Sequence, residues 1–199
     1  MKEKEDVSSS HVLTADDLQH RFVGREEAIK AASSCFARII TVAKRDVPGN
    51  LRPIIPVCAG ISGLGKTRML EEGGMILRDV MELGAERVAS VIVPYDDMYS
   101  PQEVEQSMPI AASFSWRMLY RFFLAENCSV SFKEWFKSRL PVNGHHLTFA
   151  TAVQAIECKL RKRQPDTTVP LYLFLGIDDY QCIKYVGAHQ ENPDVSLIH

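Results

Sequence analysis

This sequence lacks the features that mark secreted, membrane-spanning and strongly charged proteins. Its first ten residues, M-K-E-K-E-D-V-S-S-S, are polar and charged, and they contain no apolar run of the kind found in a signal peptide. No stretch of the chain approaches the roughly 18 consecutive apolar residues that are needed to cross a bilayer. We therefore expect a soluble protein of the cytoplasm or nucleus that has no membrane partner.

Cysteine is scarce and unpatterned. The 199 residues include five cysteines, and no two of them form a C-x-x-C pair. This spacing argues against a zinc ribbon or a disulfide framework, and it is typical of small core residues in a reducing compartment.

An excess of charge of one sign is also absent. The chain has 23 Lys and Arg against 25 Asp and Glu, which gives a formal net charge of −2. This balance provides no global attraction to nucleic acid, although a local basic groove for nucleic acid stays open as an alternative. The length is sufficient for one sizeable domain.

Three apolar runs rich in β-branched residues predict buried strands, over residues 54–59, 88–93 and 171–177. Apolar residues at helical spacing predict helices over residues 26–44 and 66–83. Strands that alternate with helices predict an α/β fold, here a three-layer α/β/α sandwich with a mainly parallel sheet.

The remaining segments complete the expected domain organisation. Residues 1–12 have almost nothing to bury and are predicted to be a disordered tail, which leaves 13–199 for the folded domain. Residues of about 95–170 are mostly helical in pattern and form an expected helical insert. Its aromatic residues would stack on bases if exposed, but their near-helical spacing favours a buried helical cluster.

A glycine-rich loop after the first predicted strand carries the clearest chemical signal. Residues 60–67, G-I-S-G-L-G-K-T, match the phosphate-binding pattern G-x-x-x-x-G-K-[ST] in full. Backbone N–H groups of such a P-loop curl around a phosphate, and the next helix adds the positive end of its dipole. We expect Lys66 to reach the β- and γ-phosphates and Thr67 to place its hydroxyl on Mg²⁺.

The third predicted strand ends in two aspartates, which supply the second half of such a site. Asp178 is the expected second Mg²⁺ ligand, through water, and Asp179 is the candidate residue that orients an attacking water. A glutamate often holds that second position, and Asp179 is one methylene shorter. We therefore expect slow hydrolysis.

Several segments together resemble the AAA+ and STAND classes of P-loop ATPases, including origin-recognition-like and NB-ARC/NACHT-like proteins. The segment F-V-G-R-E at residues 22–26 is similar to their VGRE box, and G-I-S-G-L-G-K-T-R-M-L at 60–70 is similar to the NB-ARC loop. The segment L-F-L-G-I-D-D-Y-Q more loosely resembles the D-E-Y-Q ending of ATPase modules in Crinkler-type and retrotransposon-hot-spot proteins. The resemblance implies that ATP is the nucleotide and that Val23 and Gly24 lie against the adenine.

One departure from those classes concerns the C-terminal end. Their sheet places a further strand between the P-loop strand and the aspartate strand, and an arginine finger and a lid domain follow. Only twenty residues follow Asp179 here. We therefore expect a fold that is incomplete at its C-terminal end, with residues 195–198 as a remnant of the missing strand or with more chain beyond.

The leading prediction is an ATP-binding module of an AAA+/STAND-like ATPase that acts as a nucleotide-dependent switch, with protein partners or self-association. One alternative is a P-loop kinase whose lid arginines would be Arg117, Arg121 and Arg139. Another is a truncated protein that binds nucleotide without turnover. The expected cofactors are ATP and Mg²⁺, with Lys66 and Asp179 in catalytic roles and Thr67 and Asp178 as metal ligands. The expected nucleotide-binding residues are Val23, Gly24, Gly60, Ile61, Ser62, Gly63, Leu64, Gly65, Lys66, Thr67 and Arg68.

Overall fold

The computed structural model describes residues 25–43, 55–58, 65–125, 129–139 and 144–187. Five helices and two strands are assigned within these residues. They are α1 (Glu26–Ala43), α2 (Lys66–Met81), β1 (Val88–Pro94), α3 (Ile110–Phe123), α4 (Phe132–Arg139), α5 (Phe149–Arg161) and β2 (Tyr172–Asp178). Short 3-10 turns are η1 (Ala85–Arg87), η2 (Asp97–Tyr99), η3 (Glu103–Ser107), η4 (Gly144–His146) and η5 (Tyr180–Tyr185).

The two strands form a parallel pair. The register runs from Val88 opposite Tyr172 to Pro94 opposite Asp178, so both strands end at the same edge. Just beyond that edge, the N–H of Tyr95 donates to the carbonyl oxygen of Asp178 at 3.1 Å. The predictions of strands over 88–93 and 171–177 are therefore confirmed.

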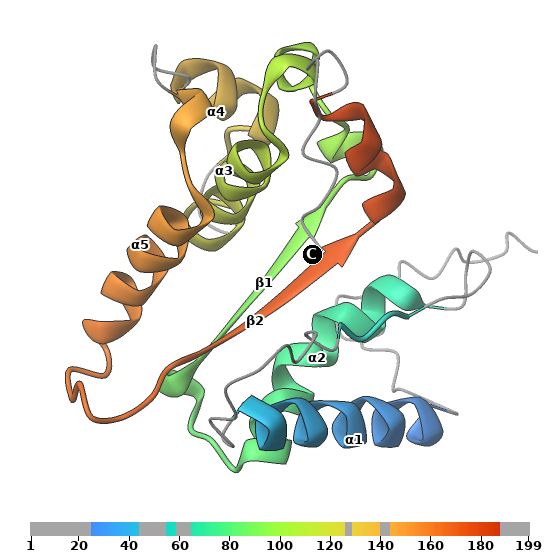
Figure 1. Cartoon of the computed structure of the whole chain (residues 1–199), viewed down its shortest axis with the longest axis vertical. Coiled ribbons are helices and arrows are strands. Elements are labelled where there is room, and N and C mark those ends of the chain that lie inside the picture. Colours follow the sequence, from blue (N-terminus) through green and yellow to red (C-terminus); the bar gives the residue numbers. More distant parts are fainter. Residues whose placement is uncertain (1–24, 44–54, 59–64, 126–128, 140–143, 188–199) are drawn as a thin grey trace, which may run out of the picture.

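Helices lie on both sides of this pair, with α1 and α2 on one side and α3 and α5 on the other (Figure 1). The general α/β class expected from the sequence is confirmed, with a small parallel sheet of two strands in the described part of the chain. The expected helices between the second and third predicted strands are present as α3, α4 and α5.

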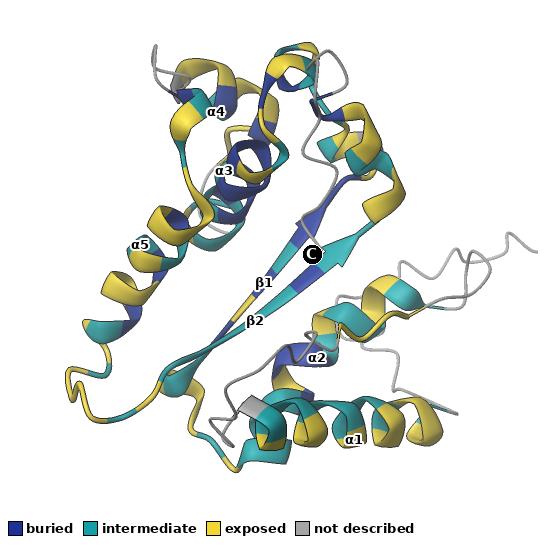
Figure 2. Ribbon diagram, in the orientation of Figure 1, coloured by how far each residue is buried: buried dark blue, intermediate teal, exposed yellow. Residues whose placement is uncertain are grey.

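The main core fills the space between the strands and α3 and α5. Alternate residues of β1, Ala89, Val91 and Val93, point to this side and are almost completely buried. They pack with Phe114 and Met118 of α3 and with residues of α5, and Figure 2 shows buried residues gathered on β1 and α3. This side of the sheet holds most of the apolar burial that stabilises the fold.

The other face of the sheet approaches α2 unusually closely. Gly73 and Gly74 are buried in the middle of α2. A Cβ atom added at Gly73 would lie 2.1 Å from the ring of Phe174, and one at Gly74 would lie 2.6 Å from Cβ of Ser90. Glycine weakens a helix interior by about 1 kcal/mol relative to alanine. Here it allows the helix backbone to lie directly against the Phe174 ring and the Ser90 side chain of the strands.

A second cluster of apolar residues joins α3 to α4. Phe132 and Phe136 of α4 pack with Met108, Ala112 and Tyr120, and Trp116 and Trp135 lie at its edge. Ring pairs such as Phe132 and Phe136, with centroids 5.1 Å apart, fill it. This burial confirms the prediction of a buried helical cluster for residues such as Tyr120 and Phe136, whereas Phe123 is 37% exposed.

The prediction of a strand over 54–59 is wrong for the residues that the structure describes there. Residues 55–58 form neither helix nor strand. Ile55 is 48% exposed and Val57 is 70% exposed, so these side chains are not part of the core. Pro56 has no N–H to donate to a neighbouring strand, and apolar composition alone does not supply a pairing partner.

No helix within the described ranges combines the length and the apolarity that crossing a membrane requires.

Candidate functional site

The end of the glycine-rich loop leads directly into α2. Gly65 has φ 71° and ψ 38°, in the left-handed region that glycine adopts without strain. The backbone N–H of Met69 donates to the carbonyl oxygen of Gly65 at 3.0 Å. Gly65 is therefore the N-cap of α2, and the next N–H groups have no partner within the helix.

The first turn of α2 is unusual in its charge. Acidic side chains are favoured at a helix N-terminus because they face the positive end of the dipole. The first turn of α1 follows this preference with Glu26 and Glu27, whereas the first turn of α2 has no acidic residue. It carries Lys66 and Arg68 instead. This end of α2 therefore has no acidic residue of its own to match its positive dipole.

The decisive contact joins α2 to the end of β2. Oγ1 of Thr67 donates to Oδ2 of Asp178 at 2.6 Å, across 111 residues of sequence. The Thr67 side chain is exposed and Asp178 is partly buried, so the pair is open to solvent on one side. The structure thus brings together the two residues that the sequence predicted as metal ligands.

Asp178 is fixed by its neighbours as well. Its other carboxylate oxygen, Oδ1, accepts from the backbone N–H of Asp179 at 3.1 Å. Its carbonyl oxygen accepts from Tyr95. The carboxylate therefore has a defined orientation at the sheet edge, facing the first turn of α2.

Asp179 has a left-handed backbone, with φ 51° and ψ 40°. Aspartate tolerates this region better than most residues, but it is uncommon outside glycine and often marks a functional site. The carboxylate oxygen Oδ1 of Asp179 accepts from the side-chain amide of Gln181 at 2.9 Å. The predicted water-orienting residue is thus engaged by a neighbour two residues later.

The other predicted site residues have different outcomes. Lys66 is the first residue of α2, beside Gly65 and Thr67. The guanidinium of Arg68 forms ion pairs along the helix with Glu72 at 2.8 Å and Glu71 at 3.6 Å, so its side chain turns toward the helix surface. Val23, Gly24, Gly60, Ile61, Ser62, Gly63 and Leu64 lie outside the described residues.

One residue at the loop was missed by the sequence analysis. Nη1 of Arg25, the residue just before α1, donates to the carbonyl oxygen of Gly65 at 2.8 Å. The VGRE box that contains Arg25 was assigned only to the base, through Val23 and Gly24. A signal was present, because an arginine at a fixed place in a motif that precedes a P-loop is a candidate for contact with that loop.

Arg117 and Arg121, which the kinase alternative would use as lid arginines, are held by contacts within the fold. Arg117 is 1% exposed, and its Nη2 lies 2.7 Å from Oε2 of the fully buried Glu105. Nε of Arg121 donates to the carbonyl oxygen of Ile92 on the outer edge of β1 at 3.0 Å. Arg117 is therefore occupied in the interior and Arg121 is held at the partly buried edge of β1, and the side chain of Arg139 lies outside the described part.

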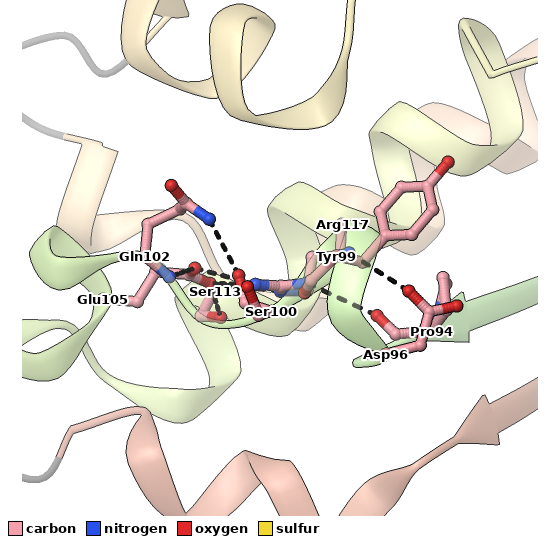
Figure 3. Close-up of polar contacts among 8 residues, drawn as sticks. All are labelled: Pro94, Asp96, Tyr99, Ser100, Gln102, Glu105, Ser113 and Arg117. Atoms are coloured by element: carbon pink, nitrogen blue, oxygen red, sulfur yellow. Dashed lines mark hydrogen bonds and ion pairs between the residues drawn. The ribbon is translucent and has the colours of Figure 1, made fainter.

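Figure 3 shows the polar network that surrounds Arg117 at the end of β1. Its guanidinium donates to the carbonyl oxygens of Pro94 and Tyr99 and lies 4.4 Å from the centre of the Tyr95 ring. The Asp96 carboxylate accepts from the backbone N–H groups of Met98 and Tyr99. These bonds hold in place the segment that follows β1. This segment begins directly after Pro94, the last residue of β1, which lies opposite Asp178.

Burial raises the pKa of Tyr95 to about 12, and the nearby Arg117 charge lowers that value only in part. The hydroxyl of Tyr95 is buried without a hydrogen-bond partner.

The donor set at Thr67 and Asp178 fits Mg²⁺ rather than a transition metal. Both donors are oxygens, and Mg²⁺ in phosphate sites takes one or two protein oxygens while keeping several waters. In the described ranges, no group of three or more His, Cys, Asp or Glu residues is placed to hold a metal by itself. A cation here would therefore need ligands from water or from a bound phosphate.

Comparison with protein-family models, with curated proteins and with solved structures found no match to this chain. The functional argument therefore depends on the residues and on their geometry.

Proposed function

We propose that this chain is the ATP-binding module of an AAA+/STAND-like P-loop ATPase, and that it acts as a nucleotide-dependent switch. One observation carries the proposal: the Thr67 hydroxyl and the Asp178 carboxylate are in direct contact although 111 residues separate them. A phosphate-binding loop requires a strand-end carboxylate beside its Ser or Thr, and chance would rarely unite the two. On this proposal, β1 and β2 belong to a three-layer P-loop sheet.

Each residue of the site has a defined role in this proposal. The N–H groups at the start of α2, together with the helix dipole, would receive the phosphates, and Lys66 would neutralise their charge. Thr67 and Asp178 would hold Mg²⁺, which supplies charge neutralisation between the phosphate oxygens.

Hydrolysis is the weaker part of the proposal. The carboxylate of Asp179 is short and accepts from Gln181, so it has less freedom to orient water than a glutamate would have. This contact favours a second candidate function, nucleotide binding with little or no turnover by the chain alone. The kinase alternative is not favoured, because Arg117 is buried in its ion pair with Glu105 and Arg121 is bonded to the carbonyl oxygen of Ile92.

Calorimetric titration with ATP, with and without Mg²⁺, tests the proposal. We expect the Lys66→Ala variant to bind ATP at least about tenfold more weakly than wild type, since it loses a direct charge contact with phosphate. Lys159→Ala, which removes an exposed lysine near the end of α5, is the matched control and should bind as wild type does. Equally weak binding by wild type and Lys66→Ala would sink the proposal.

The Mg²⁺ site has its own measurement. The Asp178→Asn variant should keep affinity for ATP without Mg²⁺ but lose most of the gain that Mg²⁺ gives to wild type. Phosphate release then separates the two candidate functions. Turnover above background by wild type that is lost in Lys66→Ala supports an ATPase, whereas binding without turnover supports the second candidate.

A further inference from the structure

Arg25 connects the start of α1 to the start of α2. Its carbonyl oxygen accepts from the N–H of Ile29 at 2.9 Å, which is the first hydrogen bond of α1. Its side chain reaches across to the carbonyl oxygen of Gly65, with Nη1 at 2.8 Å. Forty residues separate Arg25 from Gly65, so this contact belongs to the tertiary fold and not to a local turn.

The approach of the guanidinium to Gly65 is close. A Cβ atom added at Gly65 would lie 1.8 Å from Nη2 of Arg25 and 2.5 Å from its Cζ. Glycine suits the positive φ of 71°, and a side chain at this position would also force the guanidinium to move. Arg25 and Gly65 fit each other as a pair.

The contact fixes a peptide plane that matters for anion binding. The carbonyl of Gly65 and the N–H of Lys66 belong to one planar trans peptide, in which they point in opposite directions. The Gly65 oxygen accepts from both Arg25 and Met69. With that oxygen held from two sides, the N–H of Lys66 is directed away from α2 and toward the space before the helix.

We propose that Arg25 is a positioning residue, which orients the Gly65–Lys66 peptide so that the N–H of Lys66 and the first turn of α2 face a bound phosphate. This inference rests on the proposed nucleotide binding and adds a residue to its machinery. Arg25 acts through the Gly65 carbonyl and needs no contact with the ligand. It also makes the orientation of the Gly65–Lys66 peptide depend on α1, which supplies the guanidinium.

Three substitutions at Arg25 separate the hydrogen bond from the charge. Arg25→Lys keeps a charged donor, Arg25→Gln keeps a donor without charge, and Arg25→Ala keeps neither. For Mg²⁺–ATP affinity measured by calorimetry, we expect Arg25→Ala to bind about tenfold more weakly and the other two to stay within about threefold of wild type. Rescue by both polar variants is the signature of a positioning hydrogen bond.

Arg161→Ala is the matched structural control. Nη1 of Arg161 also donates to main-chain carbonyl oxygens, those of Asp166 and Val169 at 2.8 Å each, but it lies near the opposite end of β2 from Asp178. This variant should lower the thermal unfolding midpoint and leave ATP affinity unchanged. If Arg161→Ala lost as much ATP affinity as Arg25→Ala, the loss would be a consequence of lower stability of the fold. That result would overturn the inference.

A double-mutant cycle tests the fit between Arg25 and Gly65. Gly65→Ala should weaken ATP binding strongly in wild type, because the new methyl group meets the guanidinium. In the Arg25→Ala background, Gly65→Ala should cause a several-fold smaller loss of ATP affinity, since only the backbone strain remains. Additive losses would overturn the inference.

The outcomes distinguish this inference from the proposed function. If wild type and Lys66→Ala bind ATP equally weakly, the proposed function itself fails. If wild type binds, Lys66→Ala does not, and Arg25→Ala binds as wild type does, then only the inference fails. If Arg25→Gln is as weak as Arg25→Ala while Arg25→Lys binds normally, the charge of Arg25 contacts the ligand and the positioning role is overturned.

Discussion

Arg117 and Glu105 form an ion pair that is 2.7 Å long and almost completely shielded from water. The guanidinium also lies over the rings of Tyr95 and Phe132, at 4.4 and 4.6 Å from their centres. Removing two charges from water is costly, and the cost is offset only where further hydrogen bonds satisfy both groups. Here the pair joins α3 to η3 and to the end of β1, close to the strand end that faces Asp178.

Breaking this pair should be strongly destabilising. Arg117→Met leaves the Glu105 carboxylate buried without its partner, and we expect a loss of about 3–5 kcal/mol in the free energy of unfolding. Urea denaturation followed by circular dichroism measures the loss. Arg68→Ala, which removes an exposed ion pair on α2, is the control and should cost less than about 1 kcal/mol. A cost below 1 kcal/mol for Arg117→Met would contradict the structural role of the pair.

Tyr95 should make the fold sensitive to alkaline pH. Its pKa is about 12 in the folded state against 10 for an ordinary tyrosine, so above pH 10 the unfolded chain loses this proton while the native chain keeps it. The stabilisation is therefore complete below pH 10 and is lost as the pH rises from 10 toward 12. The total is on the order of 2–3 kcal/mol, from about 1.4 kcal/mol per pH unit.

Tyr95→Phe is the variant that isolates this effect. At pH 7 its free energy of unfolding should lie within about 1 kcal/mol of the wild-type value, because the hydroxyl that it lacks has no hydrogen-bond partner. At pH 11.5 it should be the more stable of the two proteins. Parallel alkaline loss of stability in wild type and Tyr95→Phe would show that other groups are responsible.

Gly73 should not tolerate alanine, although alanine is the better helix former. The added methyl group would meet the Phe174 ring, and overpacking of this kind costs about 1–3 kcal/mol. Thermal unfolding measures the change. Met75→Ala, at a 46% exposed position of the same helix, should change stability much less. The contact between Gly73 and Phe174 predicts that Phe174→Leu restores part of the stability that Gly73→Ala loses. If the second substitution restores none of it, the contact is refuted.

Lengthening Asp179 should raise turnover if the proposed function holds. Asp179→Glu restores the longer reach that orients an attacking water, and we expect phosphate release at least about tenfold faster than in wild type. Glutamate is less tolerant of the left-handed backbone, so the variant should also lose about 1 kcal/mol of stability. Asp179→Ala is the control, and equal rates for the two variants would exclude a role in turnover.

The strands that the sequence predicted correctly are those that have a partner. The runs at 88–93 and 171–177 are apolar on both faces, because helices cover both faces, and a continuous apolar run is the usual signal for such strands. The run at 54–59 has a similar composition, yet Ile55 and Val57 are exposed. Composition reports a preference for burial, whereas pairing depends on which segments meet in space.

The same limit applies to the candidate site. Thr67 and Asp178 could be singled out together from the sequence, because their residue types and positions are those that a phosphate and Mg²⁺ site requires, and the structure places them in contact. The contact of Arg25 with Gly65 was not predictable, since it depends on how α1 is placed against α2. The burial of Arg117 was not predictable either, because buried arginine is rare and its partner Glu105 carries no local signal.

The glycine pair of α2 has a mechanical consequence. Gly73 and Gly74 place the α2 backbone directly against the side chains of Phe174 and Ser90, so only one thin layer of strand side chains separates the helix from the sheet. The helix that begins at Lys66 and the sheet that ends at Asp178 would then move as one stiff body. A displacement caused by a ligand at the start of α2 would then also displace the other end of the helix, at Met81. That end lies about 22 Å away, at a rise of 1.5 Å per residue.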